Sequence, residues 1–317
     1  MKLFSAFFRL IRWPNLVFIA LTQLLFFYCI IIPSLPESYY QQNYKLTPML
    51  FYLLVTASVL IAAAGYIIND YFDINIDRVN KPGKMVVEKF INRRWAIILH
   101  LVITFAGLVL SGYVSLKTSL VVIAANIVCT LLLWVYSTTF KKKLLSGNII
   151  ISGLTAWTVL VLYFATNTTL TLAPGLPSAI ASGMHRIYKF AALYAGFAFI
   201  ISLIREVVKD IEDMEGDARY SCKTMPIVWG VPATKVFVGV WLVVLISALA
   251  IVQFYVLQIG WWLSALYVLL LVIVPLIMIL QKFYQAQTTV QYHYISNMIK
   301  LVMLTGICSI ILIKIYA

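Results

Sequence analysis

Long apolar stretches alternate with short polar segments along nearly the whole chain. The hydrocarbon core of a bilayer is about 30 Å thick, and a helix of about 20 residues crosses it. Stretches of this kind predict about nine spanning helices, at Leu16–Ser34, Pro48–Ile68, Trp95–Ser115, Thr118–Tyr136, Ile149–Thr166, Tyr188–Val208, Ala233–Leu257, Gly260–Leu280 and Ile295–Tyr316. We therefore expect an all-α membrane protein whose residues 1–317 form a single transmembrane domain.

The composition agrees with this pattern. Of the 317 residues, 63% are hydrophobic and only 11% are charged, whereas about a quarter of the residues in a soluble domain are charged. Disordered, collagen-like and disulfide-scaffold proteins are excluded, because they need polar, Gly/Pro-rich or Cys-rich sequences. Neither the cysteines nor the histidines (His100, His185 and His293) have the spacing of a metal site, so we expect these histidines to be packed or solvated.

Positive charge predicts the orientation in the membrane. With the N-terminus inside, most Lys and Arg residues fall in inner segments, and the outer ones hold only Lys45, Lys117, Arg186, Lys189 and Lys314. This asymmetry places the N-terminus and the loops 69–94 and 209–232 in the cytoplasm. It also explains the net charge of +13 without a nucleic-acid partner. Residues 1–15 mix basic and aromatic side chains and lack a cleavage site, which predicts an interfacial helix.

Nearly all the acidic residues gather in two places. The first acidic cluster is Asn69–Asp77, which contains Asp70, Asp73 and Asp77. The second acidic cluster is Lys209–Asp217, which contains Asp210, Asp213 and Asp217. Each has the spacing D-x2-D-x3-D, so three carboxylates share an arc of about 60° if a helix continues through them. Such carboxylates repel one another unless a cation neutralises them.

The ligand type indicates which cation this is. Carboxylate and amide oxygens favour Mg²⁺, Mn²⁺ or Ca²⁺, and Mg²⁺ typically binds one or two carboxylates together with substrate phosphates. Two clusters therefore predict two Mg²⁺ ions around a diphosphate, with the remaining phosphate charge neutralised by nearby bases: Arg78, Lys81, Lys84, Arg205, Lys209 and Lys223. The alternative is that the acids are solvated helix ends paired with neighbouring Lys and Arg, but matched spacing on two helices disfavours it.

The position of the clusters along the chain also carries information. They lie about half a chain apart, and each follows an even-numbered span. This predicts two related four-helix units with a ninth helix appended. Repeats of this kind commonly build a binding site at their interface.

At this point the motifs resemble a known family, the UbiA-type intramembrane prenyltransferases. The first acidic cluster with the following Arg78–Pro82 is similar to the family's N-D-x2-D-x3-D motif, and the second, with Lys223–Gly230, to its second motif. Arg12–Asn15 resembles the R-x-P-N entry to the first helix. Tyr136–Lys141, followed by Gly147 and Asn148, resembles the Y-S-x2-L-K segment, with Phe140 in place of Leu. The resemblance covers essentially the whole chain.

The resemblance implies a helix bundle around a central cavity and a Mg²⁺-dependent prenyl transfer. An isoprenyl diphosphate would ionise to a carbocation and pyrophosphate, and a lipophilic acceptor would capture the cation. The catalytic acids would hold the two ions, one with Asn69, Asp70, Asp73 and Asp77 and the other with Asp210, Asp213 and Asp217. The implied substrate-binding residues are Asn15, Asn69, Arg78, Lys84, Tyr136, Ser137, Lys141, Lys209 and Lys223. No obligate protein partner is evident.

The acceptor is the least determined part. The second cluster resembles the branch with geranylgeranylglyceryl phosphate geranylgeranyltransferases, chlorophyll synthases and homogentisate prenyltransferases, and residues 69–82 resemble its lipid-forming members most. This favours transfer of a geranylgeranyl-type chain to the hydroxyl of a prenylglyceryl phosphate, giving an ether lipid. However, Lys84–Lys89 stands where the family often has R-P-I-x-S-G. Two alternatives remain: prenylation of an aromatic quinone precursor such as dihydroxynaphthoate or hydroxybenzoate, and a cation transporter, whose acids would usually lie near the midplane.

Overall fold

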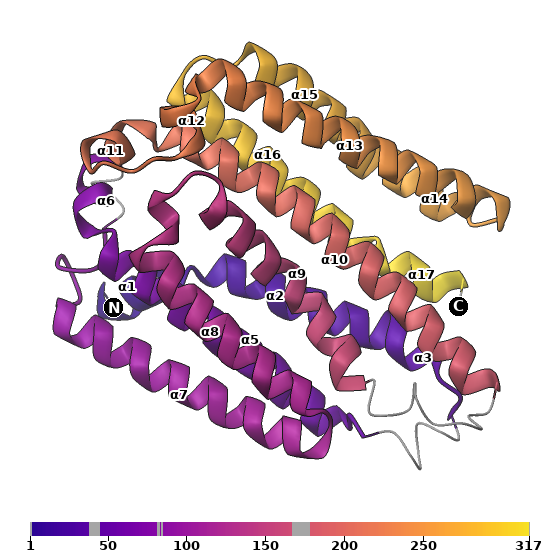
Figure 1. Cartoon of the computed structure of the whole chain (residues 1–317). Helices are drawn as coiled ribbons and strands as arrows, with labels where there is room; N and C mark the ends of the chain where they lie inside the picture. Colours follow the sequence, from indigo (N-terminus) through magenta and orange to yellow (C-terminus); the bar gives the residue numbers. More distant parts are fainter. Residues whose placement is uncertain (1, 38–44, 81–82, 84, 167–177, 317) are drawn as a thin grey trace. The chain divides into compact units, whose positions relative to one another are not determined.

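The computed structural model describes residues 2–37, 45–80, 83, 85–166 and 178–316 (Figure 1). Within them, regular structure is helical apart from an isolated bridge between Val87 and Ile91. Nine helical stretches of this described part are long and apolar enough to cross a membrane. The predicted all-α fold with about nine spans is therefore confirmed.

The spanning stretches are built from the following helices: α2 (Trp13–Phe26) with η1 (Phe27–Ile31) and α3 (Ile32–Ser34), α5 (Pro48–Phe72), α7 (Arg93–Lys117), α8 (Leu120–Thr138), α9 (Ser146–Thr166), α10 (Ser178–Glu212), α13 (Gly230–Gln258), α14 (Trp262–Val268) with η4 (Leu269–Ile273) and α15 (Val274–Gln285), and α16 (Thr289–Cys308) with α17 (Ile310–Tyr316). Shorter helices flank them: α1 (Lys2–Leu10), α6 (Ile74–Asn80), η2 (Phe140–Lys142), α11 (Met214–Arg219) and α12 (Met225–Val228).

Several helix ends differ from the sequence prediction. Residues 178–187, expected in an outer loop, form the first turns of α10, and His293, expected in an inner loop, lies within α16. Hydropathy marks only the apolar part of a helix, whereas polar residues can continue the same hydrogen-bonded helix beyond the hydrocarbon core. The spans are therefore found reliably and their ends are not.

The chain divides into two compact units. One consists of Met1–Phe140 with Trp157–Leu193, and the other of Lys141–Ala156 with Tyr194–Ala317. The division falls within α9 and α10. Each unit carries one acidic cluster, at the end of α5 in the first unit and at the end of α10 in the second. The predicted repeat of two four-helix units plus a ninth helix stays a prediction.

In the first unit, α5 packs against α2, α7 and α8 (Figure 1). An apolar core cluster lies around the end of α5, and its buried members include Leu10 of α1, Ile67 of α5, Ile74 of α6 and Val86. Burial of apolar side chains stabilises by about 25 cal/mol per Å². This cluster therefore holds α1 and the segment after α6 against the end of α5 that carries the first acidic cluster.

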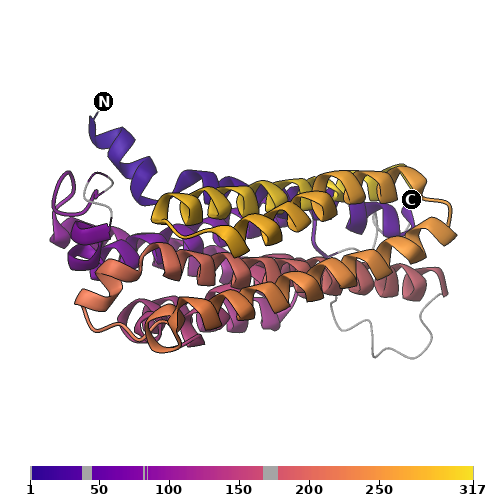
Figure 2. The same ribbon diagram turned by 90° about the horizontal axis from the view of Figure 1, so that it is seen from above.

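In the second unit, α13, α15 and α16 lie side by side (Figures 1 and 2). The core cluster of this unit joins Val207 and Ile211 of α10 to Leu242 of α13, Leu276 of α15 and Ile299 of α16. Val207 lies just before the second acidic cluster, and Ile211 lies within it, next to Asp210. Packing on one face of α10 thus determines where the acidic end of the helix lies within the unit.

Candidate active site

The first acidic cluster lies on an interrupted helix. Helix α5 ends at Phe72, Asp73 has φ −87° and ψ 0°, and α6 begins at Ile74. The N–H of Asp73 still donates to the carbonyl of Asn69 (3.0 Å), and the N–H of Asp77 donates to the carbonyl of Asp73 (2.8 Å). The sequence prediction assumed one continuous helix through the cluster, and the helix is instead interrupted at Asp73. Helical hydrogen bonds nevertheless run across the interruption. Asn69, Asp73 and Asp77 keep their spacing of one turn each.

The second acidic cluster repeats this local structure. Helix α10 ends at Glu212, Asp213 has φ −94° and ψ 4°, and α11 begins at Met214. The N–H of Asp213 donates to the carbonyl of Lys209 (2.8 Å), and the N–H of Asp217 donates to that of Asp213 (3.2 Å). In both clusters the middle aspartate thus lies in the sparsely populated region between helix and strand, where many active-site residues are found.

Polar contacts in the first cluster leave one buried oxygen without a partner. Asn69 Nδ2 donates to Asp73 Oδ2 over 2.7 Å, and both residues are buried. Asn69 Oδ1 is also buried, and it makes no hydrogen bond within the described protein. Buried polar atoms almost always have a partner. An oxygen of this kind beside a carboxylate fits a cation ligand.

Arg12 contacts Asp70, the first aspartate of the first cluster; Asp70 and Asp210 are the leading aspartates of the two clusters. Arg12 Nη2 donates to Asp70 Oδ1 over 2.7 Å, and its guanidinium lies 5.1 Å from the centre of the Tyr66 ring. The residue joins α1 to α2 with φ 52° and ψ 51°, a left-handed conformation that costs a residue other than glycine roughly 1–3 kcal/mol. Burial opposes the charge of Arg12, but Asp70, Tyr66 and Asp73 together outweigh this effect and raise the pKa of Arg12.

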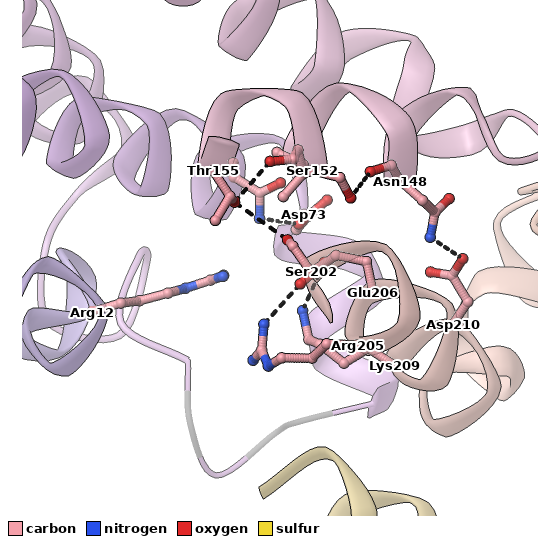
Figure 3. Close-up of polar contacts among 12 residues, drawn as sticks. Arg12, Asp73, Asn148, Ser152, Thr155, Ser202, Arg205, Glu206, Lys209 and Asp210 are labelled. Carbon is pink, nitrogen blue, oxygen red and sulfur yellow. Dashed lines mark hydrogen bonds and ion pairs between the residues drawn. The ribbon is translucent and has the colours of Figure 1, made fainter. Parts of the chain in front are cut away.

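A neutral side chain holds the leading aspartate of the second cluster. Asn148, in the first turn of α9, donates from Nδ2 to Asp210 Oδ2 over 2.8 Å (Figure 3). One turn before Asp210, Glu206 accepts from Arg205 Nη1 (2.8 Å) and Lys209 Nζ (3.4 Å). Figure 3 shows both basic side chains converging on the Glu206 carboxylate. The two basic charges beside this cluster are therefore paired with an acid outside the D-x2-D-x3-D pattern.

The donor set fits Mg²⁺. Among the described residues, no three His, Cys, Asp or Glu side chains gather closely enough to surround one ion. As the side chains lie, fewer than three acids of a cluster would bind the same ion, and Mg²⁺ typically takes one or two carboxylates and completes its shell with water and phosphate oxygens. The available donors are carboxylates and the Asn69 amide oxygen, which are ligands for hard cations.

The other predicted site residues occupy varied positions. Asn15 is half-buried in the first turn of α2, and Tyr136 is half-buried near the end of α8. Ser137 is buried and its hydroxyl donates to the carbonyl of Leu133 over 2.9 Å. Lys141 is half-buried in η2.

The predicted phosphate-binding bases are less well gathered. Arg78 is exposed and forms an ion pair with Glu88, not with an acid of the first cluster. Lys223 is exposed, and its backbone N–H donates to the carbonyl of Lys142 over 2.8 Å. Lys209 is paired with Glu206. Lys84 lies outside the described residues.

Sequence reasoning did not find the partners of the leading aspartates. Arg12 lies 58 residues before Asp70 and Asn148 lies 62 residues before Asp210, so no local pattern links either pair. The only signal was that both partners belong to segments that resemble the family. His293 is exposed, as the sequence prediction of a solvated side chain allows, and its Nδ1 also contacts Glu212 over 2.8 Å, a partner that the sequence did not indicate.

Comparisons with known proteins find one family and several relatives. The model of the UbiA prenyltransferase family matches residues 25–297. The chain is 28% identical over 260 residues to digeranylgeranylglyceryl phosphate synthase of Methanosphaera stadtmanae, covering 81% of this chain and 85% of the relative. It is 31% identical over 254 residues to the enzyme of that name from Methanothermobacter thermautotrophicus, covering 79% and 80%.

Two solved structures share the fold. One is of digeranylgeranylglyceryl phosphate synthase, with a TM-score of 0.60 and 22% identity, covering 98% of this chain and 99% of the other. The second is a UbiA homologue from Archaeoglobus fulgidus bound to GPP and Mg²⁺, with a TM-score of 0.56 and 17% identity, covering 96% and 99%.

Proposed function

Since the chain belongs to the UbiA prenyltransferase family and is therefore a membrane prenyltransferase, we propose that it transfers a geranylgeranyl-type chain to the hydroxyl of a prenylglyceryl phosphate. The observation that carries the proposal is the duplicated acidic cluster, in which each leading aspartate is held by a polar side chain about 60 residues earlier. The names of the relatives that match about four fifths of the chain favour the glyceryl phosphate acceptor.

In the proposed reaction, the bond between C1 of the isoprenyl group and the diphosphate oxygen breaks, and its electron pair leaves with pyrophosphate. The acceptor hydroxyl oxygen forms the new bond to C1 and gives up its proton, so the product is an ether. The donor and the acceptor are both lipophilic, which agrees with a site carried by membrane-spanning helices.

Two Mg²⁺ ions would stabilise the negative charge that develops on the leaving diphosphate. One ion would take its ligands from among Asn69, Asp70, Asp73 and Asp77, and the other from among Asp210, Asp213 and Asp217, with one or two carboxylates on each ion. The side chains that would bind the diphosphate and neutralise its remaining charge are Arg78, Lys84, Tyr136, Ser137, Lys141, Lys209 and Lys223. Asn15 would contact substrate beside α2. These residues orient the leaving group and keep its charge matched.

The first experiment measures pyrophosphate release by the full-length protein in detergent with Mg²⁺ and geranylgeranyl diphosphate. Geranylgeranylglyceryl phosphate, 1,4-dihydroxy-2-naphthoate and 4-hydroxybenzoate are compared as acceptors. We expect release only with the glyceryl phosphate, and none after Mg²⁺ is removed by chelation. Release only with an aromatic acceptor would contradict the ether-lipid function. Metal-dependent ion flux in liposomes without diphosphate turnover would instead favour a cation transporter.

We also propose that the N-terminus and both acidic clusters face the cytoplasm, because positive charge concentrates on that side. Glu215, within the second cluster, has a side chain that is 74% exposed. Glu215→Cys should react with a membrane-impermeant maleimide in inside-out vesicles and not in right-side-out vesicles. The wild-type chain, whose cysteines are all buried or half-buried, is the control, and the opposite labelling pattern would reverse the orientation.

A further inference from the structure

The two acidic clusters have nearly the same backbone at the middle aspartate, but their leading aspartates contact side chains of different charge. Asp70 accepts a charge-assisted hydrogen bond from Arg12 over 2.7 Å. Asp210, at the equivalent position, accepts from the neutral amide of Asn148 over 2.8 Å. A guanidinium neutralises one carboxylate charge, whereas an amide only donates a hydrogen bond.

We propose that Arg12 competes with a metal ion for the Asp70 carboxylate, so that the first acidic cluster binds a divalent cation more weakly than the second. The inference rests on the metal sites of the proposed function and goes beyond them by ranking the two. An incoming ion at the first cluster must share the Asp70 carboxylate with Arg12 or displace it. At the second cluster the side-chain partner of Asp210 among the described residues is the neutral Asn148 amide, so the ion does not compete with a basic group for this carboxylate.

Several features of the fold determine the position of Arg12. Its backbone is held in the left-handed region, and its guanidinium is placed between Asp70 and the Tyr66 ring. Its neighbour Leu10 is fully buried in the core cluster around the end of α5. These contacts hold the guanidinium beside Asp70, although 36% of the Arg12 side chain is exposed.

A consequence is that the ions load in order. The second cluster would bind its ion first. The first cluster would bind an ion once a diphosphate replaces Asp70 as the partner of the Arg12 guanidinium, because phosphate oxygens bind that group as well as carboxylates do. Arg12 would thereby discourage metal binding at the first cluster when no substrate is present.

The test counts Mn²⁺ ions bound by the full-length protein in detergent, from the electron paramagnetic resonance signal of free Mn²⁺. Mn²⁺ takes the same oxygen ligands as Mg²⁺. For the wild type we expect a tighter site that is lost in Asp210→Asn and a weaker site that is lost in Asp70→Asn. Arg12→Gln should tighten the weaker site roughly tenfold, the scale of one charge-assisted contact. Arg9→Gln, which removes the same charge from an exposed position on α1, should change neither site.

Two further variants decide the matter if Arg12→Gln does not fold. Arg12→Lys retains the charge and should leave the weaker site weak. Asn148→Lys brings a cation to Asp210 and should weaken the tighter site by a similar factor. Two wild-type sites of equal affinity, or an unchanged or weakened site in Arg12→Gln, would overturn the ranking alone. Mn²⁺ binding that depends on neither Asp70 nor Asp210 would instead overturn the metal sites of the proposed function.

Discussion

In the first acidic cluster a charged side chain holds the leading aspartate, whereas in the second a neutral amide does so. The backbone around the two middle aspartates is nearly the same, with φ −87° and ψ 0° at Asp73 and φ −94° and ψ 4° at Asp213. The partners differ: Arg12 for Asp70 and Asn148 for Asp210. One local motif can thus be joined to the rest of its unit in two electrostatically different ways.

The surroundings of the clusters extend this difference. In the first cluster Asn69 bonds directly to Asp73, while the equivalent position in the second cluster is Lys209, which pairs with Glu206. Chemistry that needs two metal ions does not require two identical sites. It requires carboxylates at the same spacing, and neighbouring residues adjust the charge of each site.

Loss of a leading aspartate should have the largest effect in either cluster. Asp70→Asn and Asp210→Asn should each lower turnover by a factor of at least about 10³, because metal ions supply several kcal/mol of charge stabilisation. Pyrophosphate release with Mg²⁺ and the glyceryl phosphate acceptor measures this. Glu215→Gln, which changes a largely exposed acid of the second cluster, should retain near-normal turnover. If only one of the two aspartates mattered, the clusters would not be functional equivalents.

Removal of the neutral partner should have an intermediate effect on stability. Asn148→Ala leaves Asp210 without its donor, and this should lower the free energy of unfolding by about 1–3 kcal/mol. Ser152→Ala is the matched control, because Ser152 lies one turn further along α9 and donates only to the carbonyl of Asn148; it should cost less than about 1 kcal/mol. Equilibrium unfolding in dodecyl sulfate compares the two. Equal stability of Asn148→Ala and wild type would mean that Asp210 does not depend on this contact.

The ion pairs at the edges of the clusters should have the smallest effect. Glu88 pairs with Arg78 and Arg93 beside the first cluster, and Glu212 pairs with His293 beside the second. Arg78, Arg93 and His293 are each roughly half exposed, so Glu88→Gln and His293→Ala should each change the free energy of unfolding by less than about 1 kcal/mol. The same unfolding assay tests both. A much larger loss in one variant would show that this edge pair organises its cluster.

Hydropathy alone was sufficient for the spans. Helices are the way in which a chain of this composition satisfies its backbone hydrogen bonds in a bilayer, so apolar stretches of the right length became the nine spans of the described residues. The start of α10 at Ser178 instead of Tyr188 was not predictable from the same signal. Residues 178–187 mix polar and apolar side chains, so their hydropathy does not mark them as part of the helix.

The spacing of the acids could also be recognised in the sequence, but the side chains that contact them could not. The pattern D-x2-D-x3-D predicted three aspartates on nearly one helix face. In the structure each helix is interrupted at the middle aspartate, Asp73 or Asp213, although helical backbone hydrogen bonds cross the interruption. In the sequence, Arg12 and Asn148 stood out only because they belong to segments that resemble the family. Glu206 and His293 had no assigned role, although Glu206 proved to be ion-paired with Arg205 and His293 to contact Glu212.

The sequence by itself determined the class of protein, the spans and the two acidic clusters, because hydropathy and residue spacing are properties of neighbours along the chain. The tertiary structure decided which side chain lies on each leading aspartate, across 58 residues in one cluster and 62 in the other. Such contacts depend on how helices pack, since a hydrogen bond forms only when both groups are brought within about 3 Å of each other. The charge difference between the clusters therefore became visible only in the folded chain.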